Sequence, residues 1–120
     1  SLYYVGVKCH ENGVPEDVCQ WDPYVRDYSL SFEDSISSII GYMQRNSMES
    51  IQLGTSIIIV PGYEFKVVDI LVTNFHQPQS TLLLLISAFV GGDWKSIYDY
   101  ALGNGFRFLS YGDSSLLFRR

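Results

Sequence analysis

The run from Leu82 to Val90 is apolar apart from Ser87, and the pair Gly91-Gly92 closes it. Such a run is far shorter than the ~20 apolar residues that a membrane-spanning helix needs. Pro78 suits the turn before a helix, and two successive glycines break one. Because the run is apolar on nearly all sides, the sequence predicts a buried helix in a soluble protein with no membrane segment.

A second helix is predicted from a cap and from spacing. Ser31 followed by Asp34 matches a capping pattern, and apolar residues then recur at helical intervals as far as Met43. This indicates an amphipathic helix from Phe32 to Arg45. Asp93 similarly precedes a third helix, which ends at the glycine-rich stretch 103–105. Its inner face is expected to carry Trp94, Ile97, Tyr98 and Ala101.

Strands are predicted where β-branched and aromatic residues cluster between turn signals. A buried strand is expected at Thr55–Val60, before the turn at Pro61-Gly62, and a second one at Phe65–Thr73. Phe106–Ser110 and Ser115–Phe118 flank Tyr111-Gly112-Asp113, which predicts a hairpin.

The N-terminal part is less regular. Leu2–Val7 lacks a capping residue and is typical of the tail of a helix that starts upstream. From His10 to Leu30 the chain is rich in turn residues, with a short strand near Val18–Trp21. No secretory signal is present, which favours a cytoplasmic location. At 120 residues and 47% hydrophobic content, we expect one α/β domain. It would have a mixed sheet with flanking helices, with residues 1–30 as helix tail and connector and 31–120 as the α/β core.

Charge and cysteine content exclude some functions. Eight basic and thirteen acidic residues give a net charge of −5, which argues against autonomous binding to a phosphate backbone. Cys9 and Cys19 lie ten positions apart without a metal-ligand spacing. Free thiols are therefore favoured over a disulfide, and no metal site is expected.

The segment from Thr73 to Thr81 joins the end of a predicted strand to the start of the buried helix. Backbone N–H groups and the helix dipole favour a polar or anionic ligand at such a junction. His76 exchanges protons near neutral pH, and Asn74, Ser80 and Thr81 offer polar contacts. The alternative is that a hydroxyl only caps the helix while His76 and Asn74 bind backbone.

Other polar residues are open to two interpretations. Glu64 follows a turn, and Asp69 lies within a predicted strand, where it must face solvent or pair with a cation such as Lys66 or Arg107. Arg107 alternates with two aromatic residues and is a candidate clamp for phosphate or carboxylate, or else a partner in a surface salt bridge. Asp113 belongs to a turn that needs no further function.

Three blocks in order resemble one family: Pro61–Asp69, Thr73–Leu82 and Ser110–Asp113. The sequence is similar, from about Gly54 to Phe118, to the C-terminal part of S-adenosylmethionine:tRNA ribosyltransferase-isomerases, enzymes of queuosine biosynthesis. It departs from the family at four places. Gln77 and Gln79 stand where leucine and lysine are common, Ile70 replaces a common glycine, and Ser114-Ser115 replace a small residue and methionine.

The resemblance implies a C-terminal fragment of a larger multidomain enzyme. Members of the family move the ribosyl moiety of S-adenosylmethionine onto an aminomethyl-deazaguanine wobble base of tRNA and isomerise it, giving epoxyqueuosine with release of adenine and methionine. S-adenosylmethionine is then a co-substrate, no metal is needed, and tRNA is the partner of the full-length enzyme. The fragment alone is expected to be inactive.

Roles at the matched positions follow from side-chain chemistry. His76 is the first candidate for proton transfer, with Glu64 or Asp113 second. The candidates for substrate binding are Tyr63, Thr73, Asn74, Phe75, Ser80, Thr81, Arg107 and Tyr111. The alternative function is a non-catalytic RNA-binding or interaction module, which the negative charge disfavours. A methyltransferase is disfavoured because no glycine-rich strand-to-helix turn with an acidic ribose partner is present.

Overall fold

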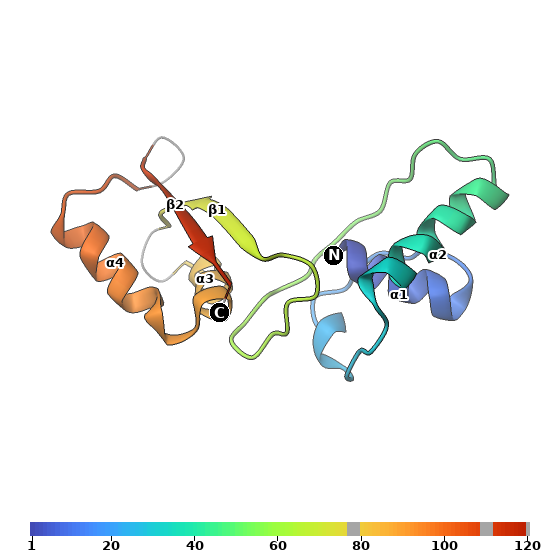
Figure 1. Cartoon of the computed structure of the whole chain (residues 1–120), viewed down its shortest axis with the longest axis horizontal. Coiled ribbons are helices and arrows are strands. Elements are labelled where there is room, and N and C mark those ends of the chain that lie inside the picture. Colours follow the sequence, from blue (N-terminus) through green and yellow to red (C-terminus); the bar gives the residue numbers. More distant parts are fainter. Residues whose placement is uncertain (77–79, 109–111, 120) are drawn as a thin grey trace. The chain divides into compact units, whose positions relative to one another are not determined.

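The computed structural model describes residues 1–76, 80–108 and 112–119, and the chain divides into two compact units, Ser1–Ile58 and Ile59–Arg120 (Figure 1). We predict that residues 1–120 belong to one domain of a larger enzyme, with a helix tail and connector at 1–30 and the α/β core at 31–120. This stays a prediction, because it concerns a longer protein. In the described part of the chain, no helix is long and apolar enough to cross a bilayer.

The first unit is built on two helices, α1 (Leu2–Asn12) and α2 (Phe32–Arg45). They approach closely where Gly6 meets Ser35, since a Cβ atom on Gly6 would lie only 2.4 Å from the Ser35 carbonyl oxygen. Ser35 is fully buried, and its hydroxyl donates to the Phe32 carbonyl at 2.8 Å. A glycine at position 6 therefore sets how near the two helices come.

The predicted helix from Phe32 to Arg45 is confirmed at both ends. The Ser31 hydroxyl accepts a hydrogen bond from the Asp34 amide at 3.1 Å, as the capping pattern requires. The helical character of Leu2–Val7 is also confirmed, but α1 continues to Asn12 and ends at Gly13, whose φ is 79°. Left-handed backbone of this kind favours glycine at a helix end.

Two strand predictions in this unit are wrong. Val18 and Thr55 form a single parallel bridge, and neither Val18–Trp21 nor Thr55–Val60 is a strand. The amides of Ser56 and Ile58 donate to the carbonyls of Val18 and Gln20, at 2.9 and 3.2 Å. The β-branched run therefore has only a short connector to pair with, and that connector turns into a 3₁₀ helix, η1 (Asp22–Tyr24).

The second unit packs a two-stranded antiparallel sheet against helices (Figure 1). Its elements are β1 (Ile70–Asn74), α3 (Leu82–Val90), the 3₁₀ helix η2 (Gly91–Asp93), α4 (Trp94–Gly103) and β2 (Ser114–Phe118). The buried core comprises Phe75, Ile86, Phe89, Val90, Tyr98, Ala101 and Leu117. Helices flanking a sheet confirm the predicted α/β class, and α3 and α4 have the predicted bounds.

The strand pairing differs from the prediction. β1 begins only at Ile70, β2 pairs with β1, and the described residues 106–108 of the predicted strand 106–110 form no strand; residues 109 and 110 lie outside the described part. A tight turn explains the difference: the Arg107 carbonyl accepts from the Asp113 amide at 2.8 Å, and the Arg107 amide donates to the Asp113 carboxylate at 2.8 Å. These contacts hold residues 107 and 113 close together, and β2 then runs on alongside β1.

Candidate functional site

The C-terminal end of β1 and the N-terminal end of β2 meet at one end of the antiparallel sheet. Asn74 lies opposite Ser114, and Thr73 lies opposite Ser115. The Ser114 hydroxyl donates to Asn74 Oδ1 at 2.9 Å, and the Ser115 hydroxyl donates to the Thr73 carbonyl at 3.1 Å. Side-chain contacts thus bind the two strands together at this end, which carries several of the predicted site residues.

His76 follows two residues after β1 and is held at two points. Its ring Nε2 lies 3.0 Å from the Thr73 hydroxyl oxygen, and its backbone amide donates to the Tyr98 hydroxyl at 3.1 Å. The ring is half-buried. If Nε2–H donates to Thr73, Nδ1 carries the lone pair and is the nitrogen that can take up a proton.

Phe75 anchors this segment in the core. Its side chain is 3% exposed, and its ring centroid lies 5.4 Å from that of Tyr98, 5.6 Å from Phe106 and 5.4 Å from Phe108. Alternate residues of extended chain point to opposite sides, so burial of Phe75 directs its neighbours Asn74 and His76 away from the core centre. The predicted contact of Phe75 with substrate stays a prediction, while its visible role is packing.

Asp113 connects β2 to the same cluster through its backbone. Its carbonyl accepts from the Phe75 amide at 3.4 Å, and its carboxylate forms a 3.6 Å ion pair with Arg107. Arg107 is 76% exposed in its side chain. Of the two interpretations of Arg107, the structure therefore displays the surface salt bridge. A Cβ atom on Gly112 would lie 2.5 Å from the Arg107 carbonyl oxygen, so this turn requires glycine.

A hollow of about 370 Å³ lies at the N-terminal end of α3. Its lining residues are Ser80, Thr81, Leu83, Leu84, Ser87 and Trp94. The Ser80 hydroxyl accepts from the Leu82 amide at 3.2 Å, whereas the Thr81 side chain makes no capping hydrogen bond. Ser80 thus acts as a cap, as the alternative interpretation expected, and both predicted hydroxyls also line the hollow.

The remaining candidates lie elsewhere in the second unit. Glu64 is 84% exposed and forms a 3.3 Å ion pair with Lys66. The Tyr63 ring packs edge-on against Phe65 at 4.8 Å. Asp69 is exposed and forms an ion pair, as expected. Its partner is Arg119, at 2.6 Å, and not the predicted Lys66 or Arg107. Tyr111 lies outside the described residues, as do Ser110 and the range 77–79.

Sequence reasoning missed Tyr98 as part of this cluster. It identified Tyr98 as an inner-face residue of α4 but assigned nothing to its hydroxyl. A buried tyrosine nearly always finds a hydrogen-bond partner for its hydroxyl, and that rule is the signal that could have drawn attention to it. The identity of the partner, the His76 amide, depends on how α4 packs and is not readable from spacing.

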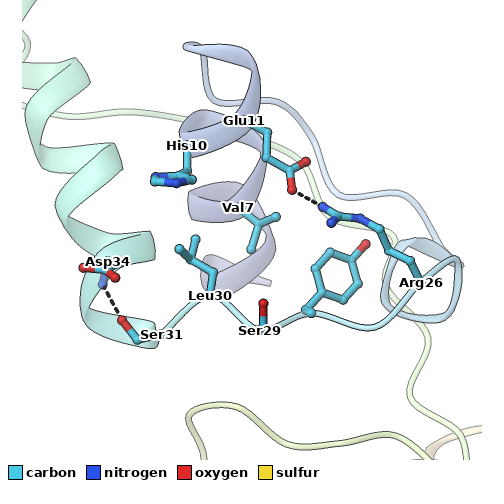
Figure 2. A pocket seen from close by; sticks show the side chains of 9 residues that line it. Val7, His10, Glu11, Arg26, Ser29, Leu30, Ser31 and Asp34 are labelled. Carbon is cyan, nitrogen blue, oxygen red and sulfur yellow. Dashed lines mark hydrogen bonds and ion pairs between the residues drawn. The ribbon is translucent and has the colours of Figure 1, made fainter.

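The first unit contains a second hollow, of about 400 Å³. Figure 2 shows Glu11 of α1 directed at Arg26 across one wall, and the Ser31 hydroxyl directed at the Asp34 amide at the start of α2. The Arg26 guanidinium also lies over the Tyr28 ring, 4.6 Å from its centroid. Because Glu11 and Arg26 neutralise each other, this wall carries no net charge that would select an ion.

Next to this hollow, Lys8 and Asp22 form a 2.8 Å ion pair. The hydrogen bond to Asp22 raises the pKa of Lys8 above its usual value. Burial acts to raise the pKa of Asp22, but its hydrogen bonds from Lys8 and from the Cys19 amide outweigh that effect, so the pKa of Asp22 is lowered.

The described residues contain no group of three or more His, Cys, Asp or Glu side chains placed to hold a metal ion. Cys9 is buried, Cys19 is exposed, and both thiols are free. The polar groups described near the paired ends of β1 and β2 include the imidazole of His76, the amide of Asn74, the carboxylate of Asp113 and the surrounding hydroxyls.

The family model described as "Queuosine biosynthesis protein" matches residues 33–117, and the chain belongs to this family. The matched range includes β1, His76, α3, α4 and most of β2. The resemblance stated from the three sequence blocks is thereby confirmed.

Similar proteins carry a more specific name. The chain is 61% identical over 66 residues to the S-adenosylmethionine:tRNA ribosyltransferase-isomerase of Chelativorans sp., covering 54% of this chain and 18% of that protein. It is 57% identical over 67 residues to the enzyme of that name from Rhizobium etli, covering 55% of this chain and 18% of the relative. The chain thus spans about a fifth of the length of these relatives.

A solved structure, the S-adenosylmethionine tRNA ribosyltransferase of Thermotoga maritima, is 29% identical with a TM-score of 0.49. The match covers 70% of this chain and 38% of that one.

Proposed function

We propose that this chain supplies part of a tRNA-modifying transferase-isomerase of queuosine biosynthesis. The reaction moves the ribosyl moiety of S-adenosylmethionine onto the aminomethyl-deazaguanine wobble base of tRNA and isomerises it, giving epoxyqueuosine, adenine and methionine. The observation that carries the proposal is the family match over residues 33–117, together with relatives of that name at 57–61% identity. S-adenosylmethionine is consumed as a co-substrate, no metal takes part, and the complete protein binds tRNA in the cytoplasm.

The transfer needs a base for the acidic proton next to the sulfonium, assistance for the departing adenine, and polar contacts that seat the sugar. His76 is the proposed base, acting through Nδ1 while Thr73 holds Nε2 at 3.0 Å. Asn74 and Thr81 are proposed to contact substrate. Glu64 and Asp113 remain second choices for proton transfer. Each already forms an ion pair, Glu64 with Lys66 and Asp113 with Arg107.

The chain alone is proposed to be inactive. The sulfonium substrate and a tRNA together present more surface than the hollow of about 370 Å³ at α3 can enclose. The net charge of −5 also opposes binding of the tRNA backbone by this chain. The remaining surface for both substrates therefore lies in parts of the family polypeptide that this chain does not contain.

The test compares the 120-residue chain with a chimeric protein, defined as the full-length Chelativorans relative in which the 66-residue matched segment is replaced by the residues of this chain aligned with it. Adenine release from S-adenosylmethionine is measured with and without tRNA that carries the aminomethyl-deazaguanine base. We expect tRNA-dependent release by the chimeric protein and none by the chain alone.

His76→Gln in the chimeric protein is expected to lower turnover by about 100-fold or more, the usual range for general acid–base groups. Gln77→Ala serves as the matched control beside it. Near-normal turnover of His76→Gln would remove His76 as the proton-transfer group. Tight tRNA binding by the isolated chain without adenine release in the chimeric protein would favour the RNA-binding module instead.

A further inference from the structure

The outward face of the β1–β2 sheet is apolar over two of its three residue pairs, and the third pair, Asn74 and Ser114, makes one end of it polar. Ile70 pairs with Phe118, and Val72 pairs with Leu116, so these four side chains share one side of the antiparallel pair. Ile70 is 52% exposed, Phe118 62%, Val72 69% and Leu116 58%. On the opposite side, Leu117 is 6% exposed and packs in the core with α3 and α4. The sheet therefore has one covered apolar face and one uncovered apolar face.

An antiparallel sheet that faces water on one side normally alternates apolar and polar residues. Here both sides carry large apolar side chains, as in strands that are buried on both faces. A contiguous apolar patch of this kind marks an interaction surface. Polar groups stand at both ends of this patch: Asp69 and Arg119 pair at 2.6 Å beside Ile70 and Phe118, and Asn74 and Ser114 are bonded at the other end. Such an arrangement is typical of an apolar centre with a polar rim.

We propose that this face, made of Ile70, Val72, Leu116 and Phe118, docks against an apolar surface of the part of the family polypeptide that this chain does not contain. The chain covers 18% of the Chelativorans relative and 19% of the Allorhizobium ampelinum relative, so about four-fifths of each lies outside the matched segment. The family match runs through Leu116, so the face belongs mainly to the shared region. Longer chains bury a larger fraction of their surface, and a family polypeptide has the residues to cover this face.

The chemistry of the face agrees with a protein occupant. None of its four side chains can neutralise a phosphate, which excludes a nucleic-acid backbone as the group bound there. A sheet of two strands is marginal in water, and contact on its second face would stabilise it. The inference depends on family membership and on the exposed face, and it holds whether or not His76 acts as proposed.

The first experiment measures thiol labelling of Val72→Cys in a Cys19→Ser background. It is run on the 120-residue chain and on the chimeric protein defined above. We expect labelling at least tenfold slower in the chimeric protein. In urea the two rates should become equal, which controls for the intrinsic reactivity of the thiol.

The second measurement needs no substitution. Hydroxyl-radical footprinting compares oxidation of Leu116 in the unmodified chain with oxidation of the aligned residue in the unmodified Chelativorans relative. We expect clear protection in the relative. Equal oxidation, or equal labelling of Val72→Cys in both proteins, overturns the proposal. Labelling in the isolated chain that slows as protein concentration rises also overturns it, because a second copy of the chain would then be the occupant.

Discussion

The imidazole Nε2 of His76 lies 3.0 Å from the hydroxyl oxygen of Thr73, which is the last but one residue of β1. A strand residue has its position fixed by the ladder, so its hydroxyl can set the orientation of a ring on the less regular segment that follows. This contact favours one orientation of the His76 ring and leaves Nδ1 outside it.

Thr73→Val removes this hydroxyl and keeps the shape of the side chain. Loss of one hydrogen bond is worth about 1 kcal/mol, which corresponds to a decrease of about fivefold in turnover if the bond orients His76 for reaction. The measurement is kcat for adenine release by the chimeric protein. Thr73→Ser, which retains the hydroxyl, should keep most of the activity, and an equal loss in both variants would point to packing as the cause.

Tyr98→Phe is expected to destabilise the second unit by about 1–2 kcal/mol, because the partly buried amide of His76 loses its acceptor. Urea unfolding of the 120-residue chain measures the loss, and faster hydrogen exchange at the His76 amide locates it. Tyr100→Phe on the same helix is the matched control, since that side chain is 64% exposed. Equal stability of the two variants would contradict a structural role for the Tyr98 hydroxyl.

Gly6→Ala is expected to destabilise the first unit by about 1–3 kcal/mol, the usual range for overpacking. The added Cβ atom would meet backbone and Cβ atoms of Ser35 at 2.4–2.6 Å, and neither can move without shifting α2. Gly41→Ala is the control: its Cβ atom would meet only the flexible end of Arg45, at 3.1 Å, and alanine favours helix. Thermal unfolding followed by circular dichroism should separate the two variants, and similar melting temperatures would refute the close approach of α1 and α2.

The Lys8–Asp22 pair predicts how the stability of the first unit depends on pH. Folding lowers the pKa of Asp22, so its carboxylate stabilises the folded state at pH values above the unfolded-state pKa of about 3.9. This stabilisation is lost as the pH falls through the folded-state pKa. Folding raises the pKa of Lys8, so its ammonium group stabilises the folded state at pH values below the unfolded-state pKa of about 10.4. This stabilisation is lost as the pH rises through the folded-state pKa.

The measurement is the free energy of unfolding of wild type and Asp22→Asn between pH 2 and 7. The difference between the two proteins should be largest near neutral pH and shrink below pH 4. Between pH 7 and pH 2, the free energy of unfolding of Lys8→Met should fall by less than that of wild type, because this variant has no ion pair to lose. A difference that does not vary with pH would show that the ion pair does not contribute to stability.

Features determined by neighbours in sequence were predictable. The bounds of α2 follow from the Ser31 cap and the helical recurrence of apolar residues, and α3 ends at its glycine pair as expected. Both signals act within one or two helical turns, so they are visible without knowledge of the rest of the chain.

Strand pairing was not predictable in the same way. The turn at Gly112 and Asp113 was identified, but β2 pairs with β1, about 40 residues earlier, and local chemistry does not reveal a partner at that distance. The run 55–60 has high β propensity and still lacks a ladder, because β propensity is realised only when a neighbouring strand is available.

The candidate site shows the same division. That a histidine, an asparagine and hydroxyls cluster after β1 follows from the sequence. The contact of the Tyr98 hydroxyl with His76, and the burial of Phe75 among other rings, arise from tertiary packing and could not be read from spacing.

Cys9 offers a means of observing the first unit in motion. Its thiol is 4% exposed, its Sγ donates to the Ser38 carbonyl of α2 at 3.2 Å, and burial raises its pKa. Thiol reagents attack the thiolate, so the closed unit protects Cys9 both by access and by protonation. In a Cys19→Ser background, the rate at which Cys9 is modified therefore reports each parting of α1 from α2. Cys9 is therefore a native probe of local opening in the first unit, and no cysteine has to be introduced to measure it.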